Sequence, residues 1–327
     1  MLIAGFPAGP WGTNCYVVAT GPGQECVVVD PGKDAASGVA EVVREHRLKP
    51  VSVLVTHGHL DHMWCVTPVA GAYDATAWIH PEDRHLLADP LAGISTDMRR
   101  MLPQLLGSQD AAWTEPDDVK ELGDGATLEL AGVEFLVDHT PGHTRGSVTF
   151  RTPYADSADV SEVMFSGDLL FAGSIGRTDL PGGDHPTMLR SLATKVLPLA
   201  DDVVVLPGHG EQTSIGRERA TNPYLLDLAD ELAEAQRGVH VGRRQHARGV
   251  EGAQQAPQPR HQPPVVGVGG LEALDHRASP DARAVSGAGA SSRSDSAVTS
   301  AAGGRQEKTP AGTPSVVGVS GPHMPRR

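Results

Sequence analysis

A single heptapeptide, Thr-His-Gly-His-Leu-Asp-His, constrains this chain more than any other part of its sequence. It places four metal-capable side chains within six residues: His57, His59, Asp61 and His62. The five residues before it, 51–55, are Val-Ser-Val-Leu-Val, and such a β-branched apolar run predicts a buried strand. Open α/β layers place their active sites just beyond the C-terminal ends of strands. Because imidazoles and carboxylates are ligands of zinc and iron, the heptapeptide predicts a metal site there.

Three later positions repeat the pattern of a short apolar segment followed by a metal-capable residue. These positions are His143, Asp168 and His209, and each has a glycine directly beside it. Glycine lets the backbone turn sharply and approach an ion closely. Four predicted strand ends therefore supply seven candidate ligands.

The spacing of these ligands resembles the metallo-β-lactamase superfamily. Within it, the chain is most similar to the glyoxalase II group, whose hallmark is Thr-His-x-His-x-Asp-His followed by a distant His, a bridging Asp and a last His. The similarity extends through residues 173–179, 183–185 and 216–223, which look like the compact, single-domain subgroup. It covers roughly the first 235 residues, one domain by size. The resemblance implies an α/β (α+β) fold, an αββα sandwich of two mixed sheets with helices outside and a binuclear site at one edge.

The resemblance also implies that the site holds two divalent metal ions, zinc in the first instance, with iron or manganese as alternatives. It distributes the ligands as follows: His57, His59 and His143 on one ion, Asp61, His62 and His209 on the other, and Asp168 as the bridge.

Two divalent ions about 3.5–4 Å apart can share a water and lower its pKa from about 15.7 toward neutrality. The resulting hydroxide would attack an acyl carbonyl, and one ion would hold the oxyanion. Asp168 would position the ions and Asp61 would orient the hydroxide, so both are candidate catalytic residues. A thioester suits this chemistry because its thiolate leaves without a strong general acid. The predicted function is therefore a glyoxalase II-type thioesterase that cleaves hydroxyacyl thioesters of a small thiol.

Two other functions stay open. A persulfide dioxygenase of the same superfamily would bind one iron through His57, His59 and Asp168, or a close variant of that set, and would consume oxygen. A non-catalytic metal-binding or partner-binding module is the other alternative, and the full ligand set argues against it. The lactamase, lactonase and nuclease branches rank lower, since the close loop similarities lie elsewhere.

Arg177 is a candidate substrate-binding residue. It follows Asp168 by nine residues, where thioester-hydrolysing relatives place a basic side chain near a carboxylate of the thiol. An arginine fork can pair bidentately with such a group. An equally weighted alternative is that Arg177 braces its own loop through Asp179. The carrier thiol also stays open between glutathione, another small thiol and coenzyme A.

Charge and composition restrict the partners. Residues 1–238 carry 16 Lys and Arg against 34 Asp and Glu, which argues against a nucleic-acid substrate and favours a small molecule. The N-terminus lacks the basic start of a signal peptide, and no stretch approaches the roughly 18 apolar residues of a membrane span. Three cysteines without C-x-x-C spacing indicate no disulfide framework. We therefore expect a cytoplasmic protein with no membrane partner, and the sequence leaves its oligomeric state unknown.

The composition changes after Gly238. Residues 239–327 contain no Phe, Trp, Tyr or Ile, so this segment cannot bury enough apolar surface to offset its chain entropy. We predict a hydrolase domain over 1–238 and a low-complexity, disordered tail over 239–327. The tail lacks the periodicity of the helical domain that larger glyoxalase II relatives carry at this point.

Apolar periodicity predicts the elements of the first segment. Strands are expected near residues 2–6, 15–20, 26–30, 51–55, 76–79, 127–130, 133–138, 147–151, 163–166 and 203–207. Helices are expected at 35–47, 62–71, 82–88, 96–106, 186–196 and 222–236.

Overall fold

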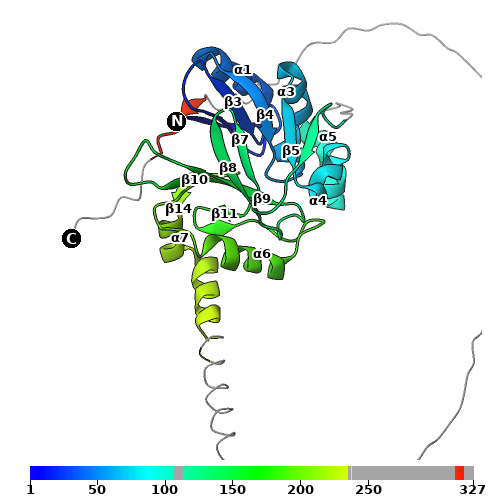
Figure 1. Ribbon diagram of the computed structural model, residues 1–327. Helices are drawn as coiled ribbons and strands as arrows, with labels where there is room; N and C mark the ends of the chain where they lie inside the picture. The colour runs from blue at the N-terminus through cyan, green and yellow to red at the C-terminus, as the bar shows by residue number, and fades with distance from the viewer. Residues whose placement is uncertain (107–112, 235–236, 238–313, 320–327) are drawn as a thin grey trace, which may run out of the picture. The chain divides into compact units, whose positions relative to one another are not determined.

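The computed structural model describes residues 1–106, 113–234, 237 and 314–319 (Figure 1). The chain divides into two units, residues 1–239 with 309–327 and residues 240–308, and all described residues belong to the first unit. Most of the predicted tail therefore lies outside the described residues.

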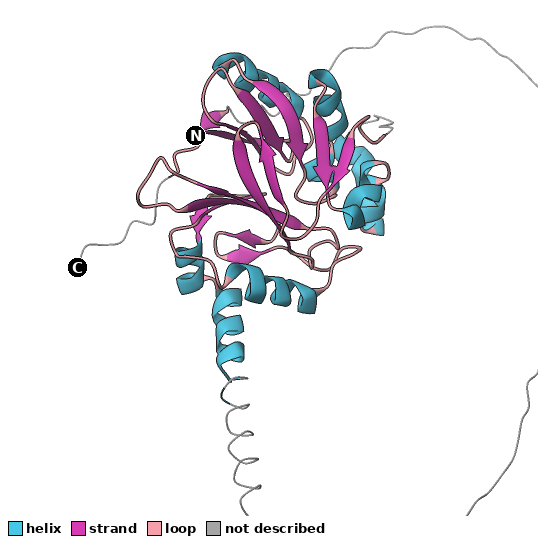
Figure 2. Ribbon diagram, in the orientation of Figure 1, coloured by secondary structure: helices cyan, strands magenta, loops and turns pink. Residues whose placement is uncertain are grey.

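Two β-sheets lie face to face, with helices on their outer sides (Figure 2). The strands of the first sheet are β1 (Leu2–Ala8), β2 (Thr13–Ala19), β3 (Glu25–Val29), β4 (Lys49–Leu54), β5 (Thr76–Ile79), β6 (Val119–Glu121) and β15 (Ser315–Val316). Those of the second are β7 (Thr127–Leu130), β8 (Val133–His139), β9 (Val148–Pro153), β10 (Glu162–Gly167), β13 (Val204–Pro207) and β14 (Thr213–Ser214), and a separate hairpin joins β11 (Leu170–Phe171) to β12 (Ser174–Ile175). The helices are α1 (Ala35–His46), α2 (Leu60–Met63), α3 (Val66–Tyr73), α4 (Pro81–Arg84), η1 (His85–Leu87), η2 (Pro90–Gly93), α5 (Thr96–Leu106), α6 (His185–Ser191), η3 (Leu192–Val196) and α7 (Ile215–Thr221), followed by a helix over 223–234.

Strand direction brings the candidate ligands to one edge. In the first sheet, strands β3 to β6 run parallel, so the loop after β4 leaves at the same edge as those after β3 and β5. In the second sheet, β10 and β13 are parallel. Strands β8 and β10 both run antiparallel to β9, so their C-terminal ends also share an edge. The mixed sheets that the sequence predicts are confirmed.

Three apolar layers hold the sandwich together. The alternation along β2 illustrates the arrangement, because Tyr16 and Val18 enter the layer between the sheets whereas Cys15 and Val17 face the layer under α1 and α3. In the second sheet, Phe165 points between the sheets and its neighbour Met164 packs against α6 and η3. Both sheets are thus covered on both faces, which is the αββα arrangement predicted from the sequence.

The predicted helix over 62–71 is the clearest local error. The structure divides it into α2 and α3, because the Cys65 amide donates a hydrogen bond to the Pro31 carbonyl (2.8 Å) and leaves the helical pattern. The bounds of α5, β5 and β7 agree with prediction. Strands β6, β11, β12 and β14 and helix α7 were missed, since segments of two to seven residues show little periodicity. No helix among the described residues is long and apolar enough to cross a membrane.

Six residues of the predicted disordered tail are ordered against the domain. Strand β15 pairs antiparallel with β1 and forms the edge of the first sheet. The Val317 amide donates to the Ile3 carbonyl (2.8 Å), and Val317 and Val319 pack on the layer between the sheets. The prediction fails here because an edge strand needs only backbone partners and a few apolar contacts, which a low-complexity segment can supply.

Two helix glycines test how tightly α1 packs on the first sheet. A Cβ on Gly38 would lie 2.4 Å from the Phe6 ring, whereas nothing lies within 4 Å of a Cβ on Gly71, which is exposed on α3. Helix propensity favours alanine over glycine by up to about 1 kcal/mol at both positions. We expect Gly71→Ala to be stabilising and Gly38→Ala to lower the free energy of unfolding by about 1–3 kcal/mol through overpacking. Urea titration measures both, and equal stabilisation would contradict the packing described.

Candidate metal centre

The loop after β4 carries the first four candidate ligands. His57 follows the strand, and His59 is the N-cap of the short helix α2, which holds Asp61 and His62. Within the second sheet, His143 lies on the loop between β8 and β9, Asp168 directly follows β10, and His209 follows β13. The structure brings all seven predicted ligands together as three overlapping groups: His57, His59 and His143; His57, His62 and Asp168; and Asp61, His62 and His209.

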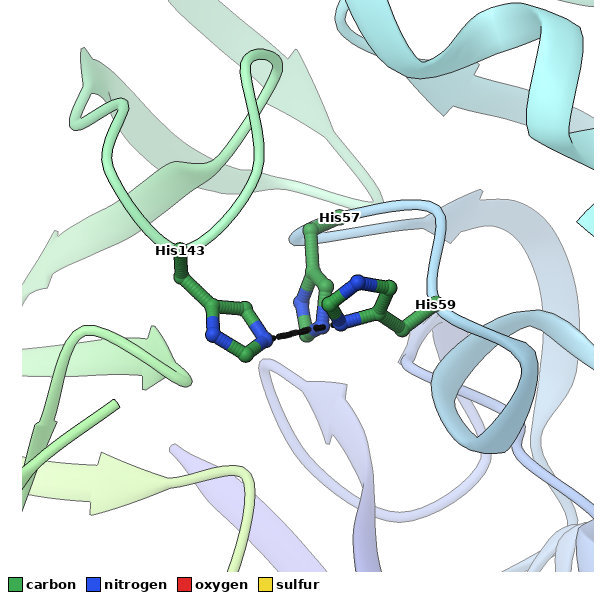
Figure 3. Close-up of side chains that lie close together, drawn as sticks. All are labelled: His57, His59 and His143. Carbon is green, nitrogen blue, oxygen red and sulfur yellow. Dashed lines mark hydrogen bonds between the residues drawn. The ribbon is translucent and has the colours of Figure 1, made fainter. Parts of the chain in front are cut away.

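Three imidazoles converge in the first group (Figure 3). The Nε2 atom of His143 lies 2.8 Å from Nδ1 of His59 and 3.2 Å from Nε2 of His57. The Nδ1 atom of His143 lies 2.7 Å from the Arg177 carbonyl, a hydrogen bond that leaves Nε2 with its lone pair toward the group. Burial lowers the pKa of His57, and it lowers the pKa of His59 to about 3. These two rings are therefore neutral and present lone pairs.

The group of Asp61, His62 and His209 adds a carboxylate beside two imidazoles. Nε2 of His209 lies 3.1 Å from Oδ2 of Asp61, and Nε2 of His62 lies 3.5 Å from the same oxygen. The other ring nitrogen of His62 lies 2.9 Å from Oδ2 of Asp30, a buried carboxylate that also accepts hydrogen bonds from the amide and hydroxyl of Thr56. Asp30 thus orients His62 and connects it to the end of β4.

Asp168 lies between the two groups. One carboxylate oxygen is 3.3 Å from Nε2 of His62, and the other is 3.5 Å from Nε2 of His143 and 3.7 Å from Nε2 of His209. Burial alone would raise the pKa of Asp168, but the nearby imidazoles, His62 foremost, hold it at about 2. Burial likewise opposes charge on His62, yet Asp168 and Asp61 raise its pKa above the usual value. The centre therefore has the negative potential that attracts a cation.

The donor set fits divalent metal ions. Oδ1 of Asp168 is buried without a hydrogen-bond partner, and such an atom is costly unless something else satisfies it. Converging imidazole nitrogens can also share a cation through their lone pairs. Nitrogen and carboxylate ligands suit zinc, iron and manganese. The residues present fit such ions, which the groups of His57, His59 and His143 and of Asp61, His62 and His209 would hold on either side of Asp168.

Glycine next to the ligands allows this convergence, as predicted. A Cβ on Gly208 would lie 2.4 Å from Oδ1 of Asp168 and 2.6 Å from the ring of His62. Any other residue at position 208 would therefore displace Asp168 or His62.

A buried carboxylate that sequence reasoning missed joins the two ligand loops. Asp83, on α4, is 2% exposed. It accepts hydrogen bonds from the Gly58 amide (2.9 Å) in the first loop, and from the Gly146 amide (2.8 Å) and Thr144 hydroxyl (2.6 Å) in the second. Asp83 therefore sets the separation between the loop of His57 and the loop of His143. No local pattern could have revealed it, because its partners lie 25 to 63 residues away.

A second missed carboxylate supports the hairpin beside the centre. Glu218, on α7, is fully buried and accepts from the Gly173 amide (2.7 Å), the Thr213 hydroxyl (2.5 Å) and the Asn222 amide group (2.9 Å). The Asn222 side chain also donates to the Ser174 carbonyl. These bonds fix the hairpin of β11 and β12 against α7.

A cavity of about 420 Å³ opens from the metal centre. This volume suits a small-molecule ligand. The described lining residues are Trp11, His59, Leu60, Asp61, Ile94, Met98, Leu102, His143, Asp168, Phe171, Ser174, Ile175, Arg177, Leu180 and His209.

Arg177 lines this cavity, but its guanidinium already has a partner. Its Nε and Nη2 atoms each lie 2.7 Å from a carboxylate oxygen of Asp179. This bidentate pair is the bracing arrangement that the sequence analysis weighed against substrate binding. Both side chains are more than half exposed, so the pair is accessible to a competing carboxylate.

A family model described as the metallo-beta-lactamase superfamily matches residues 8–209. The chain belongs to this superfamily.

Two relatives span nearly their whole length within this chain. An uncharacterised protein of Mycobacterium tuberculosis is 45% identical over 230 residues, which are 70% of this chain and 100% of that protein. The hydroxyacylglutathione hydrolase GloC of Haemophilus influenzae is 32% identical over 225 residues, 69% of this chain and 98% of that protein. Each alignment thus covers about 70% of this chain.

Two solved structures share the fold. The crystal structure of the BLEG-1 B3 metallo-beta-lactamase matches with a TM-score of 0.58 and 37% identity, covering 68% of this chain and 99% of that one. The crystal structure of TTHA1623 in a di-iron-bound form matches with a TM-score of 0.54 and 36% identity, with the same coverage.

The hydrogen bonds by which Asp83 joins the two loops lead to a prediction. Asp83→Ala leaves two buried amides and a hydroxyl without their acceptor, so the ligand loops should separate and metal affinity should fall about 10- to 100-fold. Competition with a chelator measures the affinity, and circular dichroism verifies that the variant is folded. Glu82→Ala, an exposed neighbour on α4, is the control and should bind metal as the parent does. Unchanged affinity in a folded Asp83→Ala variant would contradict the positioning role.

Proposed function

We propose that this protein is a glyoxalase II-type thioesterase, which hydrolyses hydroxyacyl thioesters of a small thiol with two divalent metal ions. The carboxylate of Asp168, within 3.7 Å of ligand nitrogens from both groups, is the observation that carries the proposal. A single ion would leave either the three-histidine group or the group of Asp61, His62 and His209 unused. Zinc is the metal we propose, with iron or manganese as alternatives.

Two ions held at the centre would supply a water of lowered pKa and a polarised carbonyl. The residues of the chain prepare the site for that chemistry. Burial keeps His57 and His59 neutral, so their lone pairs stay available as ligands. Asp61 and Asp168 stay ionised at neutral pH, since the neighbouring imidazoles lower both pKa values. Asp61 lies beside His62 and His209, where it can orient the attacking water. Asp168 lies between this group and the three-histidine group and would set the distance between the two ions.

The comparisons support this proposal. The relative named hydroxyacylglutathione hydrolase is 32% identical and matches over 98% of its length. The structure named for its di-iron form supports a two-ion centre on this fold. We propose a small-molecule substrate, because the acidic 1–238 segment disfavours nucleic acid. We propose a cytoplasmic location, because the three cysteines indicate no disulfide framework.

A persulfide dioxygenase is the second candidate. It would use one iron on His57, His59 and Asp168 or a close variant, and would not need the group of Asp61, His62 and His209. The presence of that group favours the hydrolase. Hydrolysis of β-lactams is a further alternative, raised by the name of the BLEG-1 structure.

Metal analysis and a substrate panel test the proposal together. We expect two equivalents of divalent metal per chain and metal-dependent hydrolysis of acyl thioesters, with no oxygen uptake and no turnover of a β-lactam. Asp168→Ala should lose more activity than His62→Ala, because the Asp168 carboxylate lies near His143 as well as near His62 and His209, and the loss should exceed about 100-fold. One equivalent of iron with oxygen consumption would instead establish the dioxygenase. Residual activity of Asp168→Ala above that of His62→Ala would contradict the bridging role.

We propose further that Arg177 binds a carboxylate of the thiol carrier in competition with Asp179. Arg177→Met should raise KM for carboxylate-bearing thioesters by about 10- to 150-fold and spare a neutral alkyl thioester, as expected for one charge-assisted hydrogen bond of roughly 1.5–3 kcal/mol. Asp179→Ala should lower KM for carboxylate-bearing thioesters, because it leaves the Arg177 guanidinium free to bind them. If Arg177 only stabilises its own loop, KM rises equally for the charged and the neutral thioester. In that case both Arg177→Met and Asp179→Ala lower the melting temperature.

A further inference from the structure

The cavity beside the metal centre is lined by two different sets of side chains. Five apolar residues belong to one cluster around η2 and α5: Trp11, Leu60, Ile94, Met98 and Leu102. The other set comes from the segment 171–180, and it contains Ser174 and Arg177. Ile175 of this set packs with the layer under the second sheet, a different cluster from the first. The cavity therefore has one wall of apolar side chains. The other wall includes the Ser174 hydroxyl and the Arg177 guanidinium among its side chains.

The apolar wall is held in place by packing. Leu60, Ile94 and Leu102 are each less than 9% exposed, and Trp64, Leu91 and Trp113 pack behind them. None of the five wall residues offers a charged group or a carbonyl-type side chain to a ligand; the indole of Trp11 has the one hydrogen-bond donor. The cations of α5, Arg99 and Arg100, are exposed and do not line the cavity. A polar acyl group would lose its hydration against this wall without gaining partners.

We infer that the substrate is a thioester whose acyl group carries an apolar chain, with that chain packed on the wall formed by Trp11, Leu60, Ile94, Met98 and Leu102. This inference rests on the proposed function and adds the acyl class to it. The reacting carbonyl lies at the metal centre, the acyl chain extends toward α5, and the thiol carrier extends toward Ser174 and Arg177. A hydroxyl next to the carbonyl is compatible with this arrangement, because it stays near the metal centre and away from the wall.

A series of acyl groups on one neutral thiol, N-acetylcysteamine, tests the inference with the metal-loaded full chain. We expect kcat/KM to rise about 4-fold per methylene, and thus roughly 250-fold from acetyl to hexanoyl, as each methylene leaves water. Glutaryl, which ends in a carboxylate, should be a worse substrate than hexanoyl by at least about 10-fold. The S-hexyl and S-ethyl thioethers of N-acetylcysteamine cannot be hydrolysed, so calorimetric titration compares their binding without turnover. The S-hexyl thioether should bind more tightly than the S-ethyl thioether.

A pair of variants on α5 assigns the effect to the wall. Met98 lines the cavity, whereas Met101 on the same helix is 53% exposed and does not line it. Met98→Arg should reverse the order of glutaryl and hexanoyl, because it brings a cation to the chain's end. Met101→Arg adds the same charge outside the cavity and should leave the order unchanged. Metal content should equal that of the parent in both variants.

The outcomes separate the two proposals. Absence of hydrolysis for every thioester would refute the proposed function and this inference with it. Hydrolysis that does not depend on acyl length, or a Met98→Arg variant that still prefers hexanoyl, would refute the inference and leave the thioesterase intact.

Discussion

The convergence of seven ligand side chains at one sheet edge is the constraint on which the rest of this structure depends. Within each group of three residues, the ligand atoms lie within 4.8 Å of one another, although the residues are spread from His57 to His209. Neutral imidazoles and ionised carboxylates this close and this deeply buried are unfavourable by themselves. The sandwich must therefore be rigid enough to hold them, and both sheets direct strand ends toward the same point to do so.

Buried carboxylates outside the ligand set supply much of that rigidity. Asp30 joins β3 to the β4 loop through Thr56 and His62, and Asp83 joins the β4 loop to the β8–β9 loop. Glu218 holds the hairpin that forms part of the cavity. Asp83 and Glu218 accept only from amides and hydroxyls, so they work as hydrogen-bond hubs between segments and not as ion pairs.

Different parts of the fold carry the candidate ligands and the cavity walls. Loops at the strand ends carry the candidate ligands, and η2, α5 and the β11–β12 hairpin supply much of the cavity wall. Changes in these outer elements alter the walls without moving the ligands.

The sequence by itself determined the candidate ligands and most of the strands, because both follow from local patterns: each candidate ligand or ligand run follows a short apolar segment, and the bounds of β5, β7 and α5 follow from periodicity. Only the tertiary structure decided which distant groups meet. Asp83 contacts the β8–β9 loop 61 and 63 residues away, the His143 ring bonds to the Arg177 carbonyl, and β15 joins β1 from the far end of the chain. These contacts depend on how the chain folds back on itself, and no short stretch of sequence encodes that geometry.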